Sequence, residues 1–179
     1  MTELRSYRRV VRNRKKNSVP LSSLRTSDVV KTVVQDPRRL EELVRMLEDK
    51  DRGIRGRAAA TLARLSESHP RRLLRVLAGL RDALSDDSAY VRWYVVYALG
   101  RVGSRFPAQS GVFISDLGTG LDDENRIVRI LTGRALSQMA ARSPMAVEEL
   151  FQNGKREMPA AVARVLRKSK TKSSKEGNR

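Results

Sequence analysis

The sequence repeats itself with a step of 37 residues, and this period constrains the fold more than any other feature. Leu47, Leu84 and Leu121 open three matching stretches that each run on without a gap. A proline recurs at the same step before each following unit. A period between about 20 and 50 residues is typical of stacked units that bury their apolar faces against one another. The sequence therefore predicts an all-α fold, a short α-solenoid of about three to four helix pairs stacked as a right-handed superhelix.

Each unit is expected to hold two antiparallel helices. The first begins at a proline, which suits the first helical position because its missing N–H would have no partner there. The second follows an acidic turn, which suits the N-cap and the positive end of the helix dipole. In the third unit, Gly111, Gly118 and Gly120 predict a first helix that is short or irregular.

These signals divide the chain into three parts. A basic N-terminal extension and helical cap covers 1–36, a repeat domain covers 37–168, and a disordered basic tail covers 169–179. Within the repeat domain, the units are expected at 37–69, 70–106 and 107–143, followed by a partial unit at 144–168.

An aspartate and an arginine recur in fixed columns of the repeat, most clearly in DDSAYVRWYVVYALGRVG at 86–103. With the small residues and the leucine that follow, these columns resemble HEAT repeats over roughly residues 37–166. The resemblance implies a solenoid whose second helices line the concave surface, and HEAT proteins are mostly binding scaffolds. It also implies structural pairing between two sets of residues, which are Asp49, Asp86 and Asp123 on one side and Arg55, Arg92 and Arg129 on the other.

The positions of the second helices that the core does not use are the candidate binding surface. They combine the only tryptophan of the chain with two of its four tyrosines and several arginines, and no acidic residue falls in these rows. Arginine beside aromatic rings suits carboxylates, phosphates and bases through charge-assisted hydrogen bonds and cation–π contacts. The alternative is that the aromatic rings pack into the neighbouring unit and the arginines are solvated. The candidate partner-binding residues are Arg57, Arg64, Trp93, Tyr94, Tyr97, Arg101 and Arg134.

Charge is concentrated at the two ends of the chain. The sequence carries 37 Lys and Arg against 20 Asp and Glu, a net charge of +17. Residues 1–36 and 160–179 each contribute +6, and the middle contributes +5. Such asymmetry indicates an anionic partner, although basic ends also simply favour solubility. The candidate anion-binding tail residues are Arg8, Arg9, Arg12, Arg14, Lys15, Lys16, Arg167, Lys168, Lys170 and Lys172.

No motif in the sequence indicates catalysis, a metal or a cofactor. The chain has no cysteine, and its one histidine, His69, stands before Pro70 in a turn between units. The glycines at 118 and 120 lack the spacing of a phosphate-binding loop. Some HEAT-like proteins are alkylpurine DNA glycosylases, but those place a carboxylate beside the aromatic residues of the concavity, and the rows here hold none.

The sequence therefore favours a non-enzymatic module that binds an acidic protein or peptide on a concave arginine and aromatic face. A nucleic-acid-binding protein that uses the groove and both basic ends is the alternative, and a homo-oligomer stays open. The sequence has no run of apolar residues long enough for a transmembrane helix and no secretory signal, so a cytoplasmic protein is expected.

Overall fold

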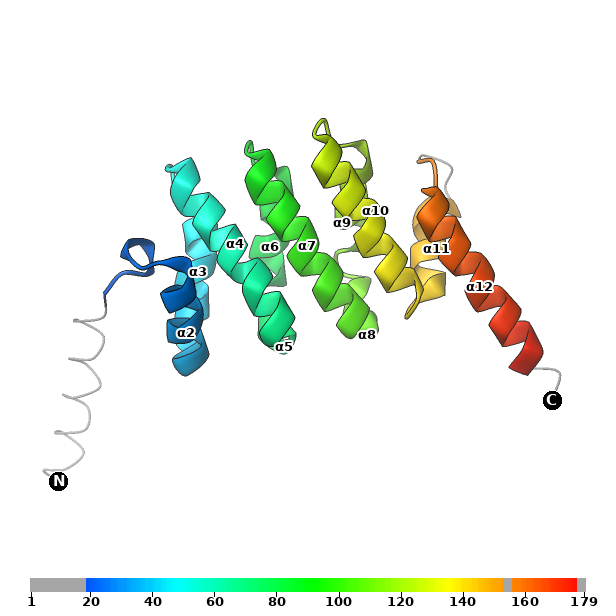
Figure 1. Cartoon of the computed structure of the whole chain (residues 1–179), viewed down its shortest axis with the longest axis horizontal. Helices are drawn as coiled ribbons and strands as arrows, with labels where there is room; N and C mark the ends of the chain where they lie inside the picture. Colours follow the sequence, from blue (N-terminus) through cyan, green and yellow to red (C-terminus); the bar gives the residue numbers. More distant parts are fainter. Residues whose placement is uncertain (1–18, 153–155, 177–179) are drawn as a thin grey trace, which may run out of the picture.

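The computed structural model describes residues 19–152 and 156–176, with side chains as far as residue 171. The chain forms a row of helix pairs, and the two ends of the described chain lie at opposite ends of the row (Figure 1). The second helices of the pairs are α4 (Arg52–Ser68), α7 (Ala89–Arg105), α10 (Arg126–Ala140) and α12 (Ala160–Glu176). The all-α solenoid predicted by the 37-residue period is confirmed.

The first half of each pair is made of shorter pieces. Before them, η1 (Leu21–Ser23) and α2 (Thr26–Gln35) lie at the N-terminal end of the row. The first halves comprise η2 (Pro37–Arg39), α3 (Leu40–Arg45) and η3 (Met46–Glu48); α5 (Pro70–Leu73), α6 (Leu77–Asp82) and η4 (Ala83–Ser85); α8 (Pro107–Ser110), α9 (Ile114–Thr119) and η5 (Gly120–Asp122); and α11 (Pro144–Gln152).

The breaks in the first halves follow the repeat. An irregular first helix was expected only in the third unit, but the second unit breaks at the same register position. Val76 has φ −128° and Phe113 has φ −135°, so both leave the helical region. Both side chains are buried, Phe113 completely. The break is therefore a feature of the packing and does not depend on the glycines of the third unit.

The core is built from columns of the repeat. At one step of 37 residues, Leu62, Leu99 and Leu136 are each 0% exposed. The column three residues further on, which ends in Met139, is buried in the same way. Complete burial of such a side chain contributes about 1.5–3 kcal/mol. The second helices pack on one another through these columns, with α7 between α4 and α10.

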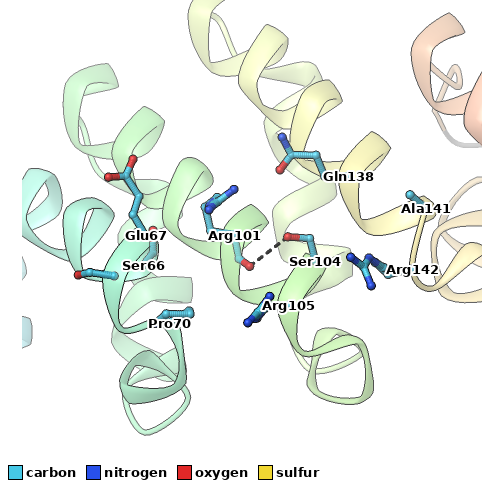
Figure 2. Close-up of a pocket in the computed structure, with 10 residues that line it drawn as sticks. Ser66, Glu67, Pro70, Arg101, Ser104, Arg105, Gln138, Ala141 and Arg142 are labelled. Carbon is cyan, nitrogen blue, oxygen red and sulfur yellow. Dashed lines mark hydrogen bonds between the residues drawn. The ribbon is translucent and has the colours of Figure 1, made fainter.

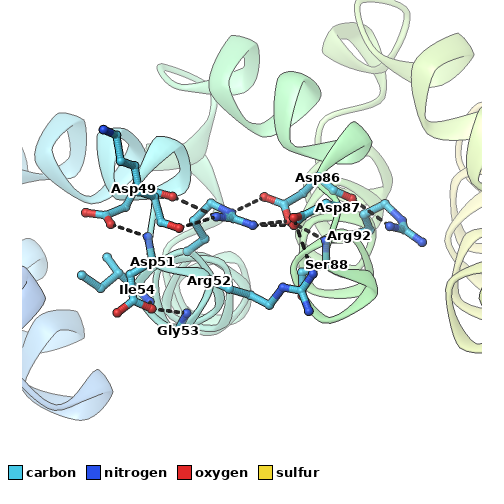
Figure 3. Close-up of polar contacts among 11 residues, drawn as sticks. Asp49, Asp51, Arg52, Gly53, Ile54, Asp86, Asp87, Ser88 and Arg92 are labelled. Carbon is cyan, nitrogen blue, oxygen red and sulfur yellow. Dashed lines mark hydrogen bonds and ion pairs between the residues drawn. The ribbon is translucent and has the colours of Figure 1, made fainter.

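The aspartates and arginines that recur in the repeat form a ladder of ion pairs between units rather than pairs within one unit. Arg55 Nε donates to Asp86 Oδ2 at 2.7 Å, within the polar contacts around Asp86 that Figure 3 shows. Arg92 Nε donates to Asp123 Oδ2 at 2.8 Å. Each arginine also donates to a backbone carbonyl of its own unit, as Arg92 Nη1 does to Asp86 O at 2.8 Å. The ladder fixes the turn of each unit to the turn of the next.

The two ends of this ladder correct the expected pairing. Asp49 accepts a hydrogen bond from the backbone N–H of Asp51 at 2.8 Å. Arg129 donates to the backbone carbonyls of Asp123 and Glu124. Asp49 has no preceding unit and Arg129 meets no aspartate of a following turn in the described part of the chain, so neither forms the pair that the resemblance implied.

The C-terminal segment differs from the expectation of a disordered tail. Disorder was expected from residue 169, but α12 continues as far as Glu176, so that expectation is wrong for 169–176. Val162 and Leu166 are buried and anchor the helix, and Lys170 forms an ion pair with Glu148 at 2.5 Å. An anchored helix extends readily because each further residue adds one backbone hydrogen bond.

One buried hydroxyl in the core lacks a partner and offers a direct test of the repeat register. The side chain of Thr132 is 0% exposed, and its Oγ1 forms no hydrogen bond with any of the described residues. Val95 occupies the same column one unit earlier. We expect Thr132→Val to raise the free energy of unfolding by about 1–2 kcal/mol, because an unsatisfied buried polar group is removed. Urea denaturation followed by circular dichroism measures it.

Thr61 is the matched control for this prediction. Thr61 is equally buried at 1% exposed, but its Oγ1 donates to the carbonyl of Arg57 at 2.7 Å. Thr61→Val therefore loses a hydrogen bond, and we expect it to leave stability unchanged or to lower it by up to about 1 kcal/mol. Equal shifts in both variants would show that the unpaired hydroxyl of Thr132 has no cost.

Candidate functional site

Three adjoining hollows cross the second helices, and together we call them the cross-helix groove. The first, of about 700 Å³, lies between α2, α4 and α7. The second, of about 130 Å³, lies between α7 and α10, and the third, of about 530 Å³, lies at the C-terminal ends of α4, α7 and α10. Tyr97 lines the first two hollows, and Arg101 lines the second and third. The three hollows therefore follow one another across the row of helices.

Four helices that lie next to one another in the row each contribute a cation to the groove. They are Lys31 on α2, Arg64 on α4, Arg101 on α7 and Arg134 on α10. All four are exposed, and their side chains form no hydrogen bond or ion pair with any residue that the structure describes. Since none of the four forms an ion pair with a carboxylate of the described residues, these cations are available to an anionic ligand.

The third hollow adds two cations that the sequence analysis missed. Arg105 and Arg142 line it together with Arg101, and Figure 2 shows the three arginine side chains around Ser104. Arg142 lies 37 residues after Arg105, so the repeat itself would have identified the pair. Both stand at or beyond the last turn of their helices, where cations also interact favourably with the negative end of the helix dipole.

Tyrosines form the apolar part of the groove. Tyr94 and Tyr97, two of the candidate binding residues, both line the first hollow. Tyr90, which was not predicted, packs against Tyr94 with ring centroids 4.9 Å apart and against Trp93 at 5.1 Å. Its hydroxyl donates to that of Tyr94 at 3.4 Å, and this hydrogen bond raises the pKa of Tyr90.

Trp93 and Arg57 are the two predicted residues that lie outside the cross-helix groove. Trp93 is half-buried against the core and lines none of its three hollows. Arg57 lines a separate hollow of about 410 Å³ with Tyr90, and its Nη2 donates to the carbonyl of Ser22 at 2.7 Å. The alternative of packing into the solenoid therefore describes Trp93, and Arg57 holds the N-terminal segment.

A carboxylate also lies in the groove, although none was found in the rows taken from the sequence. Glu67, on the last turn of α4, lines the first and third hollows. Tyr97 donates its hydroxyl to Glu67 Oε1 at 2.6 Å, and this hydrogen bond raises the pKa of Tyr97. The comparison with glycosylases was rejected for lack of such a carboxylate, so that reason is wrong. The rows missed Glu67 because they followed single columns and ignored the helix end.

The histidine has a structural role at the end of α4. His69 Nδ1 lies 2.9 Å from Ser68 Oγ. The hydroxyl of Ser68 donates to the carbonyl of Arg64 at 3.3 Å, which leaves its oxygen to accept from the imidazole. The described residues contain no group of His, Asp and Glu that could hold a metal ion.

The predicted tail residues are only partly described. Arg8, Arg9, Arg12, Arg14, Lys15 and Lys16 lie outside the described residues. Arg167 and Lys168 are exposed on α12, Lys170 pairs with Glu148, and Lys172 belongs to the same helix. None of the described helices is both long and apolar enough to cross a membrane.

Comparisons with known proteins agree with this architecture. A family model described as HEAT repeats matches residues 40–113. No curated protein matches the sequence. Residues 40–113 of this α-solenoid therefore match HEAT repeats, and the resemblance found in the aspartate and arginine columns is confirmed over that part of the chain.

The solved structures similar to the chain include designed proteins. One is described as computationally designed armadillo repeat proteins for modular peptide recognition; it is 19% identical with a TM-score of 0.62, over 82% of this chain and 69% of that chain. Another is a designed armadillo repeat protein in complex with the peptide (KR)4, 16% identical with a TM-score of 0.58, over 85% of this chain and 70% of that chain. At these identities the likeness is one of fold.

Proposed function

We propose that this protein is a non-enzymatic interaction module that binds an acidic protein or peptide in the cross-helix groove. The observation that carries the proposal is a set of cations without partners among the described residues, one each from α2, α4, α7 and α10, that line the adjoining hollows of the groove with Tyr94 and Tyr97. Guanidinium groups bind carboxylates in a bidentate manner, and tyrosines supply contact area at a low cost in conformational entropy. The net charge of +17 would also steer an acidic partner towards the chain.

The likeness in fold to a designed peptide-binding protein supports a peptide as the ligand of this chain. The peptide proposed here is acidic, whereas the peptide bound by the designed protein is basic. The designed armadillo protein that resembles this chain is described in complex with (KR)4, a peptide of alternating basic residues. In this chain the basic groups belong to the groove, so a complementary segment carries carboxylates. A segment that crosses the row of helices would contact several units, as an extended ligand does on a solenoid.

Nucleic acid is the second candidate, and the observation that favours it is the exposed basic helix α12. Arg167 and Lys168 on this helix are exposed and add cations beyond the groove. A ligand held by phosphate contacts with these residues would bind in proportion to the number of phosphates neutralised. Its affinity would fall with log salt at a slope near −0.7 per phosphate for a single strand.

Fluorescence anisotropy with a labelled glutamate-rich peptide and a labelled single-stranded DNA, each across a salt series, tests the proposal. We expect the peptide to bind at about 150 mM salt and the double variant Arg64→Gln with Arg101→Gln to weaken it at least about tenfold, which equals 1.4 kcal/mol. The matched control is Arg75→Gln with Arg71→Gln, which removes two exposed arginines that line none of the groove hollows. If the two double variants weaken the peptide equally, or only DNA binds, the proposed function is wrong.

A further inference from the structure

The four groove cations are spaced by the packing of the helices that carry them. Neighbouring packed helices have axes about 8–10 Å apart, and α4, α7 and α10 stand side by side in the row (Figure 1). Arg64 and Arg101 occupy one column of the repeat. The next residue of that column is Gln138. Arg134 lies about one helical turn before Gln138, which is a shift of about 5.4 Å along α10. The steps from Arg64 to Arg101 and from Arg101 to Arg134 are therefore about 8–11 Å between backbone positions.

An extended peptide matches this step at three residues. In the extended polyproline II conformation the chain rises about 3.1 Å per residue with three residues per turn, so every third side chain returns to the same face after about 9 Å, whereas two residues cover about 6 Å and four about 12 Å. A segment with a carboxylate on every third residue would present one carboxylate to each helix. The residues between carboxylates would then lie over the intervening tyrosines, Tyr94 and Tyr97, which line the same hollow as Arg64.

Glu67 makes the groove unsuited to a ligand with unbroken negative charge. Its carboxylate lines the same hollow as Arg64 and another hollow with Arg101. A phosphate backbone carries a charge at every nucleotide, so one phosphate would fall close to Glu67 and be repelled. A peptide with uncharged residues between its carboxylates avoids this repulsion, and like-charge repulsion of this kind is a common source of specificity.

We infer that the cross-helix groove selects an extended segment with an acidic residue at every third position and uncharged residues between them. The inference rests on the proposed function and specifies the partner that it requires. Arg64, Arg101 and Arg134 would each meet one carboxylate, and Glu67 would exclude a carboxylate from the positions between them. Lys31 adds a cation at the α2 end of the groove.

A set of labelled peptides of equal length and composition, with four glutamates placed at every second, third or fourth residue among serines and glycines, tests the spacing by fluorescence anisotropy. We expect the peptide with glutamate at every third residue to bind at least about tenfold more tightly than the other two at about 150 mM salt. Equal affinities for all three would overturn the spacing and leave the proposed function standing. Failure of every peptide to bind would overturn both.

A charge exchange tests the register on one helix. Arg101→Glu should weaken the binding of the preferred peptide, and replacement of one inner glutamate of that peptide by lysine should restore it towards the original affinity. The exchange is informative because it compares matched and mismatched charges within one complex. The control is Arg75→Glu, which changes the net charge equally outside the groove hollows. If no lysine position restores binding to the Arg101→Glu variant, the one-to-one contact is wrong. It is also wrong if the lysine peptide gains affinity equally for the Arg75→Glu control.

Substitution of Glu67 tests whether its carboxylate disfavours ligands with closely spaced negative charges. We expect Glu67→Gln to strengthen binding of the peptide with glutamate at every second residue more than binding of the preferred peptide. The substitution removes the repulsion between Glu67 and the ligand carboxylates that fall between the groove cations. Thermal denaturation of the same variant shows whether the lost Tyr97 hydrogen bond alters the fold. Equal gains for both peptides would show that Glu67 acts only through net charge.

Discussion

Arg92→Met is expected to lower the free energy of unfolding by about 3–5 kcal/mol, because it leaves a buried carboxylate without its partner. The side chains of Arg92 and Asp123 are each only 9% exposed, and the two groups form a bidentate pair with both distances at 2.8 Å. The substitution also removes the donor that holds the carbonyl of Asp86. Urea denaturation followed by circular dichroism measures the loss.

Arg129→Met is the matched control for this prediction. Arg129 occupies the same column of the next unit, but its side chain is exposed and donates only to two backbone carbonyls. We expect this control to cost no more than about 1 kcal/mol, because no buried carboxylate is left behind. Equal losses in the two variants would show that burial of the pair between units has no special importance.

The same ion pair has a signature in the dependence of stability on pH. Burial raises the pKa of Asp123, but the hydrogen bonds from Arg92 and from the backbone N–H of Asn125 outweigh it, so the pKa is lowered below its ordinary value of 3.8. Because the folded-state pKa is lowered, the stabilisation from this carboxylate is present above the ordinary value and is lost as the pH falls through the folded-state value. Asp123→Asn should therefore flatten the loss of stability below about pH 4.

The columns of the repeat predicted the fold well because they report burial. A position that packs between units must be apolar in every copy, and a step of 37 residues makes this visible in one sequence. Leu62, Leu99 and Leu136 are accordingly all buried. The partners of the ladder arginines were harder to predict, because a column fixes the residue type but does not show whether Arg55 reaches the aspartate of its own unit or that of the next.

The groove was predicted only in part, because its surface depends on helix ends and on side-chain direction. Arg64, Arg101 and Arg134 line the groove as the rows indicated. Glu67 belongs to none of those rows and enters from the last turn of α4, where it accepts from Tyr97. The helical extent of α12 was missed for a related reason, since a segment without apolar residues gives no periodic signal even when an anchored helix continues through it.

Gly100 and Gly133 should respond in opposite directions to the same substitution, although both are glycines inside second helices. A Cβ at position 100 would lie 2.5 Å from Ala135 Cβ and 3.2 Å from Ala135 Cα, so α7 and α10 would have to move apart. A Cβ at position 133 would meet only Pro159, at 3.9 Å. The first contact is with a methyl group and backbone that have no rotamer to change.

We therefore expect Gly133→Ala to stabilise the protein by up to about 1 kcal/mol, which is the difference in helix propensity. Gly100→Ala gains the same propensity but adds an overpacking cost of about 1–3 kcal/mol, and Gly100→Leu should lose about 3 kcal/mol or more because further atoms enter the same contact. Thermal and urea denaturation of the three variants measure these differences. A stabilising Gly100→Ala would show that α7 and α10 are not packed closely at Ala135, and the continuous path from Arg101 to Arg134 across these two helices would then have to be redrawn.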